Sequence, residues 1–155
     1  MTEQGAGRGA AAALPALALA LTLAGCGGGP TADTTIRFWA MGREGEVVQE
    51  LVRDFERENP SIRVVVQQIP WGAAHEKLLT AHVGRSSPDL AQLGNTWIAE
   101  FTALRAIEPL DRRVAASSVV RPEGYFAGIW DTNVVDGVVY GVPWYVDTLG
   151  LFYLR

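Results

Sequence analysis

The sequence predicts an α/β fold, a mostly parallel sheet with helices on both faces. Three β-rich runs, at residues 36–40, 62–69 and 89–93, alternate with segments whose apolar residues recur at helical spacing. The connections are short, and strand–helix–strand units joined in this way form parallel sheets with right-handed crossovers. The second run contains three consecutive valines at 64–66, which is typical of a strand covered on both sides.

The first unit begins with the β-rich run Ile36-Arg37-Phe38-Trp39-Ala40, which a glycine-bearing turn at 42–45 follows. The next segment predicts a helix that ends at Asn59-Pro60, because the residue before a proline avoids the helical conformation. The apolar residues of this helix, which we expect to face the sheet, are Val47, Val48, Leu51, Val52 and Phe55.

The second and third helices follow the next two strands. Pro70-Trp71-Gly72 turns into a helix whose apolar side we expect to be Ala74, Leu78, Ala81 and Val83. Asn95 or Thr96 can cap the third helix, since short polar side chains accept hydrogen bonds from the first free N–H groups. That third helix is expected to turn Ile98, Phe101 and Leu104 inward.

The alternation stops after residues 108–111. Residues 122–130 are predicted to be helical. Two short apolar runs, at 134–135 and 138–140, flank Asp136-Gly137, which is a strong hairpin signal. The apolar run at 149–154 is predicted to be a further strand.

The N-terminal region has the pattern of an export signal. Residues 10–24 are rich in alanine and leucine, carry no charge and are preceded by Arg8. About 20 apolar residues are needed to cross a bilayer, so this shorter run predicts a secretory signal peptide at 1–25.

The end of this run, Leu23-Ala24-Gly25-Cys26, resembles a bacterial lipobox, in which a diacylglycerol is attached to Cys26. The alternative is a buried cysteine in a core helix. Three glycines and a proline follow at 27–30, however, and these residues stop a helix. We therefore expect residues 26–34 to form a flexible, lipid-anchored tether.

The composition narrows the classes of partner. A net charge of −4 gives no reason to expect nucleic acid, which requires clustered Lys and Arg. Cys26 is the single cysteine, so neither an internal disulfide nor a thiolate metal site is expected.

His75 and His82 are two helical turns apart, too far to share a metal without other ligands. The glycines at 27–29 lack the ending of a phosphate loop. No cofactor and no metal are expected.

The tryptophans indicate a binding site, because ligands of open α/β sheets bind beyond the carboxyl ends of the strands. Trp39 ends the first strand, Trp71 follows the second, and Trp97 opens the helix after the third. Trp144 follows the hairpin, whereas Trp130 lies within a predicted helix. Any one of these residues could cap the local core, but four on one rim favour a cleft. Their expected polar neighbours are Arg43, Glu44, Gln68, His75, Asn95, Thr96, Tyr145 and Asp147.

Aromatic faces beside polar side chains suit a sugar ring, whose C–H faces stack on indoles and whose hydroxyls need donors and acceptors. A glycosidase would instead need two carboxylates that face each other across the scissile bond. Glu44, Glu76, Asp131 and Asp147 are available, but no spacing pairs two of them. We therefore expect no enzymatic activity.

Three stretches carry a resemblance: FERENPSIRVVVQQIPW at 55–71, PDLAQLGNTWIAEFTALRAIEPLD at 88–111 and VVYGVPWYVDTLGLFYLR at 138–155. In this order, after a lipobox, they resemble the extracellular solute-binding lipoproteins (family 1, sugar-binding group) of bacterial ATP-binding-cassette importers. The resemblance implies a periplasmic-binding-protein-like fold of two lobes that close on a ligand. It also implies that residues 35–155 are the first part of the N-terminal lobe, ending near the first hinge strand, with the second lobe largely missing.

The resemblance further implies a protein that is not an enzyme and is anchored through Cys26 at the extracytoplasmic face of the membrane. Such a protein captures a mono- or oligosaccharide and delivers it to permease subunits. The open alternatives are another solute in the same scaffold (a polyamine, a peptide or a metal chelate), a secreted glycoside hydrolase, and an adhesin or structural lipoprotein. From the strand ends and the resemblance together, the expected ligand contacts are Trp39, Arg43, Glu44, Trp71, Asn95, Thr96, Trp97, Trp144, Tyr145 and Asp147.

Overall fold

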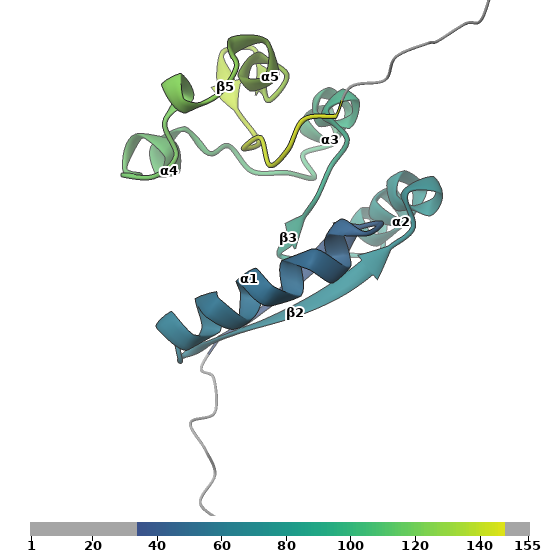
Figure 1. Ribbon diagram of the computed structural model, residues 1–155. Coiled ribbons are helices and arrows are strands. Elements are labelled where there is room, and N and C mark those ends of the chain that lie inside the picture. Colours follow the sequence, from purple (N-terminus) through teal and green to yellow (C-terminus); the bar gives the residue numbers. More distant parts are fainter. Residues whose placement is uncertain (1–33, 148–155) are drawn as a thin grey trace, which may run out of the picture.

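The computed structural model describes residues 34–147 and shows a parallel three-stranded sheet with flanking helices (Figure 1). The strand order is β2-β1-β3, and β1 pairs in parallel with both neighbours. The sheet and its helices are β1 (Thr34–Met41), α1 (Glu44–Glu58), β2 (Ile62–Ile69), α2 (Trp71–Val83), β3 (Leu90–Ala91), η1 (Asn95–Trp97) and α3 (Ile98–Ala103). The remaining elements are α4 (Asp111–Ala115), η2 (Pro122–Gly124), α5 (Ala127–Asp131), β4 (Val134–Val135) and β5 (Val138–Val139). The predicted α/β alternation is confirmed.

Helices cover both faces of β1, because successive side chains of a strand point to opposite sides of the sheet. Phe38 and Ala40 pack with Val48 of α1 on one face. On the other face, Trp39 and Met41 belong to a buried cluster with Ile69, residues of α2 (Ala74, Leu78, Ala81) and Phe101 of α3. The two clusters form the core and hold the carboxyl end of the sheet between α1 on one side and α2 with α3 on the other.

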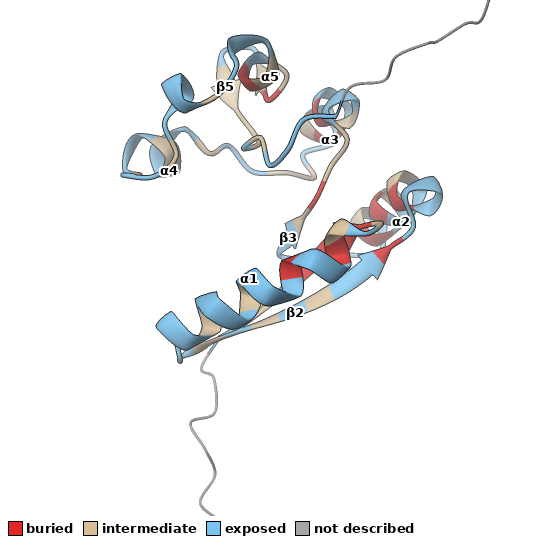
Figure 2. Ribbon diagram, in the orientation of Figure 1, coloured by how far each residue is buried: buried red, intermediate tan, exposed pale blue. Residues whose placement is uncertain are grey.

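The coverage is less complete than predicted (Figure 2). In α1 only Val48 is buried among the predicted inner residues, with Val52 half-buried, whereas Val47, Leu51 and Phe55 are 58%, 59% and 40% exposed. The helix packs on β1 and β2 alone, and this surface covers a narrower arc than the apolar face of the helix. On the opposite face of the sheet, Val65 in the middle of β2 is half exposed, and Val83 at the end of α2 is exposed.

The third helix also differs from the prediction. Neither Asn95 nor Thr96 caps it with a side chain, because these residues form the 3-10 turn η1, and α3 begins only at Ile98. Ile98 and Phe101 are buried as predicted, but Leu104 is exposed. The helix ends at Ala103, and the chain turns away at Arg105, whose φ is 54°.

The segment predicted as one helix at 122–130 is divided, because Tyr125 and Phe126 adopt extended backbone between η2 and α5. Trp130 is buried on α5, as expected of a core residue. The hairpin β4–β5 is confirmed, with Asp136 and Gly137 both at positive φ, as a type I′ turn requires.

The signal peptide predicted at 1–25, the acylated Cys26 and the strand predicted at 149–154 lie outside the described residues. So do residues 26–33 of the predicted tether, whereas Thr34, its predicted last residue, already belongs to β1 and pairs with Ile62. Within residues 34–147, none of the helices has the length and apolar character needed to span a bilayer.

Candidate ligand-binding site

The candidate site lies at the carboxyl end of the sheet, where the loops after β1, β2 and β3 meet. The loop after β1 carries Gly42 and leads into Glu44, the first residue of α1. The loop after β2 leads into Trp71, the first residue of α2. The segment after β3 carries Gln92 and then Trp97 at the end of η1. Parallel pairing therefore gathers these side chains at one edge, as the strand-end rule predicts.

Gly42 allows the first two loops to approach closely. Its φ of +52° is a conformation that side chains rarely adopt. A Cβ at this position would lie 2.9 Å from Cδ1 of Trp71 and 3.2 Å from Oε2 of Glu44. The backbone is held here by hydrogen bonds from Gly42 N–H to the carbonyl of Ile69 (2.9 Å) and from Gln68 Nε2 to the carbonyl of Gly42 (2.6 Å).

Two tryptophans form an aromatic pair at this edge. The rings of Trp71 and Trp97 lie 5.9 Å apart in an edge-to-face arrangement, an orientation that aromatic pairs favour. Trp71 is 38% exposed and Trp97 is half-buried. Asn95 and Thr96, which precede Trp97, are exposed. The pair therefore presents apolar ring surface beside polar side chains.

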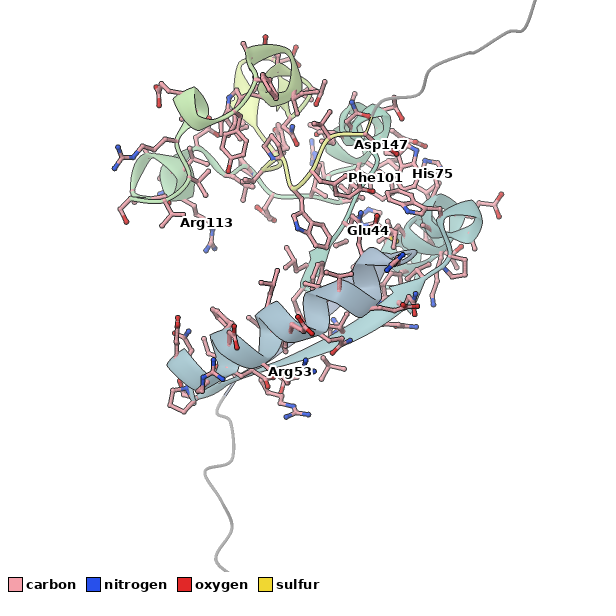
Figure 3. All side chains as sticks on the ribbon, viewed as in Figure 1. Glu44, Arg53, His75, Phe101, Arg113 and Asp147 are labelled. Carbon is pink, nitrogen blue, oxygen red and sulfur yellow. The ribbon has the colours of Figure 1, made fainter. Side chains whose placement is uncertain are left out.

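Glu44, labelled in Figure 3, supplies an acceptor close to Trp71, because both side chains lie against Gly42. Its Oε2 atom is buried and has no hydrogen-bond partner among the described residues. Glu44 is the first residue of a 15-residue helix, where the helix dipole places partial positive charge beside the carboxylate. A buried acceptor without a donor is costly, so a ligand hydroxyl that donates to Oε2 would be stabilised.

Tyr145 belongs to the same group. Desolvation raises the pKa of its phenol. A hydrogen bond to the Glu44 side chain and the negative charges of Glu44 and Asp147 raise this pKa further, and a hydrogen bond with Gln92 acts in the opposite direction. The phenol therefore stays protonated at neutral pH and remains a hydrogen-bond donor. The segment after the hairpin thus returns to the edge where Glu44 lies, although 101 residues separate Glu44 from Tyr145 in the sequence.

Gln92 was not among the predicted contacts, although it lies at the carboxyl end of β3. It is buried, and its Oε1 atom accepts a 2.6 Å hydrogen bond from Met41 N–H. This bond ties the end of β1 to the segment after β3, beside Tyr145. The sequence analysis placed Gln92 inside the strand predicted at 89–93, whereas β3 ends at Ala91 and Gln92 directly follows it.

The four tryptophans do not share one rim as predicted. Trp39 is buried in the core, where Nζ of Lys77 lies 4.8 Å from its ring centroid. Its side chain points between the sheet and α2, because β1 extends to Met41 and Trp39 does not end the strand. Trp144 is 44% exposed and packs against Phe38 (5.9 Å) and Tyr145 (6.2 Å) rather than against the other tryptophans.

Arg43 borders a neighbouring depression. This open depression of about 690 Å³ is lined by Gly42, Arg43, Glu46, Gln68 and Pro70. The Arg43 side chain is exposed and forms no ion pair within the described part of the chain. In that part, no group of three or more His, Cys, Asp and Glu residues is arranged to hold a metal ion.

With the fold and the candidate site described, comparison with known protein families identifies the class of protein. The profile of the bacterial extracellular solute-binding protein family matches residues 40–154. The chain therefore belongs to the bacterial extracellular solute-binding proteins, a family of binding proteins, which confirms the resemblance and the fold expected from it.

Solved structures and curated relatives agree. The sugar-binding protein MalE from Xanthomonas citri matches with a TM-score of 0.70 and 61% identity, over 72% of this chain and 28% of that chain. The GacH receptor of Streptomyces glaucescens, solved with acarbose, matches with a TM-score of 0.64 and 28% identity, over 72% and 29%. A lipoprotein of Streptomyces antibioticus is 31% identical over 78% of this chain and 27% of the relative. The chain thus spans about a quarter of the length of the curated relatives that it matches.

Proposed function

We propose that this chain contributes one wall of a cleft in which a mono- or oligosaccharide is captured and then delivered to the permease subunits of an importer. The observation that carries the proposal is the adjacency of an exposed aromatic pair, Trp71 with Trp97, and the unsatisfied carboxylate oxygen of Glu44. The proposed contacts are Arg43, Glu44, Trp71, Asn95, Thr96, Trp97, Trp144, Tyr145 and Asp147.

The chemistry of this edge matches a sugar better than the other solutes. The indoles of Trp71 and Trp97 can cover the C–H face of a pyranose. Oε2 of Glu44 can accept hydrogen bonds from hydroxyls, and the exposed side chains of Arg43 and Asn95 can donate them. A sugar ring needs both kinds of partner around one apolar face, whereas a polyamine requires acceptors alone.

Trp39 is not part of the proposed contact surface. Because its ring is buried under Lys77 and between β1 and α2, it supports the edge from inside the core. A ligand contact at Trp39, as expected from the sequence, would require the side chain to leave this cluster.

The proposed location of the protein in the cell envelope is inferred from its N-terminal sequence. Residues 1–25 serve as a signal peptide, and Cys26 carries a diacylglycerol that holds the mature protein at the extracytoplasmic face of the membrane. Residues 26–33 act as the tether, since Thr34 already belongs to β1, and the residues from 34 onward form the first part of an N-terminal lobe. A family of extracellular binding proteins and a lipoprotein relative support this arrangement.

The test is a calorimetric titration of the intact protein with maltose, acarbose and cycloalternan, chosen because solved relatives that are 28% and 26% identical bind the latter two. Spermidine and a tripeptide serve as the other arms. We expect binding of at least one saccharide, with no release of reducing sugar afterwards. Binding of spermidine or the tripeptide with no response to any saccharide would contradict the proposal.

A further inference from the structure

His75 of α2 contacts Trp97 of the aromatic pair, and it lies near Phe101 (Figure 3). Its ring centroid is 5.0 Å from that of Trp97 and 5.7 Å from that of Phe101, and both contacts are edge-to-face. Phe101 is buried in the core. Trp71, Trp97, His75 and Phe101 thus form a continuous row of rings from the exposed edge to the interior.

A hydrogen bond fixes the histidine in this row. Nε2 of His75 lies 2.6 Å from Oε2 of Glu100 on α3. The imidazole donates, because an ionised carboxylate only accepts. The two side chains are one-third and about one-half exposed, respectively, so this bond is at the surface while the ring contacts face inward.

The orientation of the Trp97 indole depends on side-chain contacts, which include Gly94 and the core cluster as well as His75. Trp97 ends η1, a three-residue 3-10 turn without a side-chain cap, and the turn is closed by one backbone hydrogen bond from Trp97 N–H to the carbonyl of Gly94. The short turn alone does not fix the indole in one rotamer. A fixed indole binds a ligand more tightly than a mobile one, because ordering a side chain on binding costs entropy.

We propose that His75 is a positioning residue that holds the Trp97 indole in its orientation toward Trp71, with Glu100 fixing the imidazole from α3. The proposal rests on the proposed function only for its effect on sugar affinity. Its effect on Trp97 can be measured without any ligand.

The charged groups around His75 come from two helices. Glu100 of α3 is its single ion-pair partner within 4.0 Å among residues 34–147. On α2 its neighbours in sequence are Glu76 and Lys77, and Lys77 lies over the Trp39 ring in the core.

The ligand-free experiment compares His75→Gln and His75→Phe with His82→Gln, the same substitution one heptad further along α2. Near-ultraviolet circular dichroism reports the coupled Trp71–Trp97 pair. Tryptophan fluorescence between pH 5 and 8 reports a neighbouring imidazole, because a protonated imidazole quenches indole more strongly than a neutral one, and histidine is the side chain that changes charge in this interval.

We expect His75→Gln to lose both the coupled dichroism signal and the pH-dependent quenching. His75→Phe should recover the dichroism, because it restores a ring against Trp97, but not the pH dependence. His82→Gln should match the wild type in both. A His75→Gln protein that melts cooperatively and keeps both signals would overturn the proposal.

The ligand experiment uses maltose, acarbose and cycloalternan. His75→Gln should weaken saccharide affinity about tenfold, equal to about 1.4 kcal/mol, and His75→Phe should recover part of this loss. Unchanged affinity in His75→Gln, despite the loss of dichroism, would overturn the role of His75 in binding. If the wild type binds none of the three sugars while the ligand-free signals behave as expected, the sugar function fails and the positioning of Trp97 stands.

Discussion

The indole of Trp71 and the carboxylate of Glu44 meet at one backbone position, so that a single added methyl group on Gly42 would touch both. This relationship joins the start of α1 to the start of α2. It also explains why the aromatic surface and the buried acceptor lie together, since neither loop could approach the other across a larger residue.

Gly42→Ala should weaken saccharide affinity and destabilise the fold by about 1–2 kcal/mol, the cost of placing an ordinary residue in the left-handed region. The matched control is Gly137→Ala, which has φ +79° but no neighbouring atom within 4 Å of the added Cβ. Melting curves should show the cost of the left-handed backbone in both variants and a further loss in Gly42→Ala, whose Cβ meets Trp71. Calorimetry should show reduced affinity for Gly42→Ala alone. Equal affinities would mean that the Trp71–Glu44 contact does not shape the site.

Glu44→Gln should weaken saccharide binding by about 1–1.5 kcal/mol, because a hydrogen bond to a charged acceptor contributes more than one to the neutral amide oxygen that remains. Glu58→Gln, at the opposite end of α1 and exposed, controls for the loss of one negative charge. The measurement is calorimetric titration of both variants. An affinity loss of the same size in the two variants would point to a general effect of charge and against a direct contact.

Tyr145 should ionise at higher pH than an ordinary tyrosine, since desolvation and the carboxylates of Glu44 and Asp147 raise its pKa. A raised pKa means that the folded state holds the proton more tightly than the unfolded state. The resulting stabilisation is present below the ordinary tyrosine pKa and is lost as pH rises through the raised value. Ultraviolet titration should therefore show one late-ionising tyrosine, which Tyr145→Phe removes and Glu44→Gln shifts to lower pH. A late-ionising group that persists in Tyr145→Phe would assign this behaviour to another residue.

The sequence located much of this edge because Trp71, Trp97 and Glu44 follow directly after strands or turns, and parallel strands bring their carboxyl ends together. Trp39 was placed differently because the strand extends past it to Met41, so its side chain points into the core. The pairs His75–Glu100 and Tyr145–Glu44 depend on how separate elements pack, and no local pattern encodes that distance. Likewise, the exposure of Val47, Leu51 and Phe55 depends on how much sheet lies beneath α1, which helical periodicity does not reveal.

Cys26→Ser should release the protein from the membrane fraction or leave its signal peptide uncleaved, because stable retention requires the diacyl group at that residue. Gly28→Ser, two positions later, is the control and should remain with membranes. Fractionation followed by mass spectrometry of the N-terminus measures both outcomes. Wild-type protein that accumulates unacylated in the medium would rule out the lipid anchor.

The most direct test of a sugar site at the sheet edge compares Trp71→Ala with Trp130→Ala by calorimetric titration and thermal melting. Trp71 is partly exposed beside Glu44, whereas Trp130 is buried on α5 with Tyr125 at 5.3 Å. Trp71→Ala should weaken saccharide binding by about 1–3 kcal/mol with little loss of stability. Trp130→Ala should cost about 3–5 kcal/mol of stability and leave the affinity of the folded fraction unchanged. Affinity losses that are equal in the two variants and follow the loss of stability would contradict a binding site at this edge.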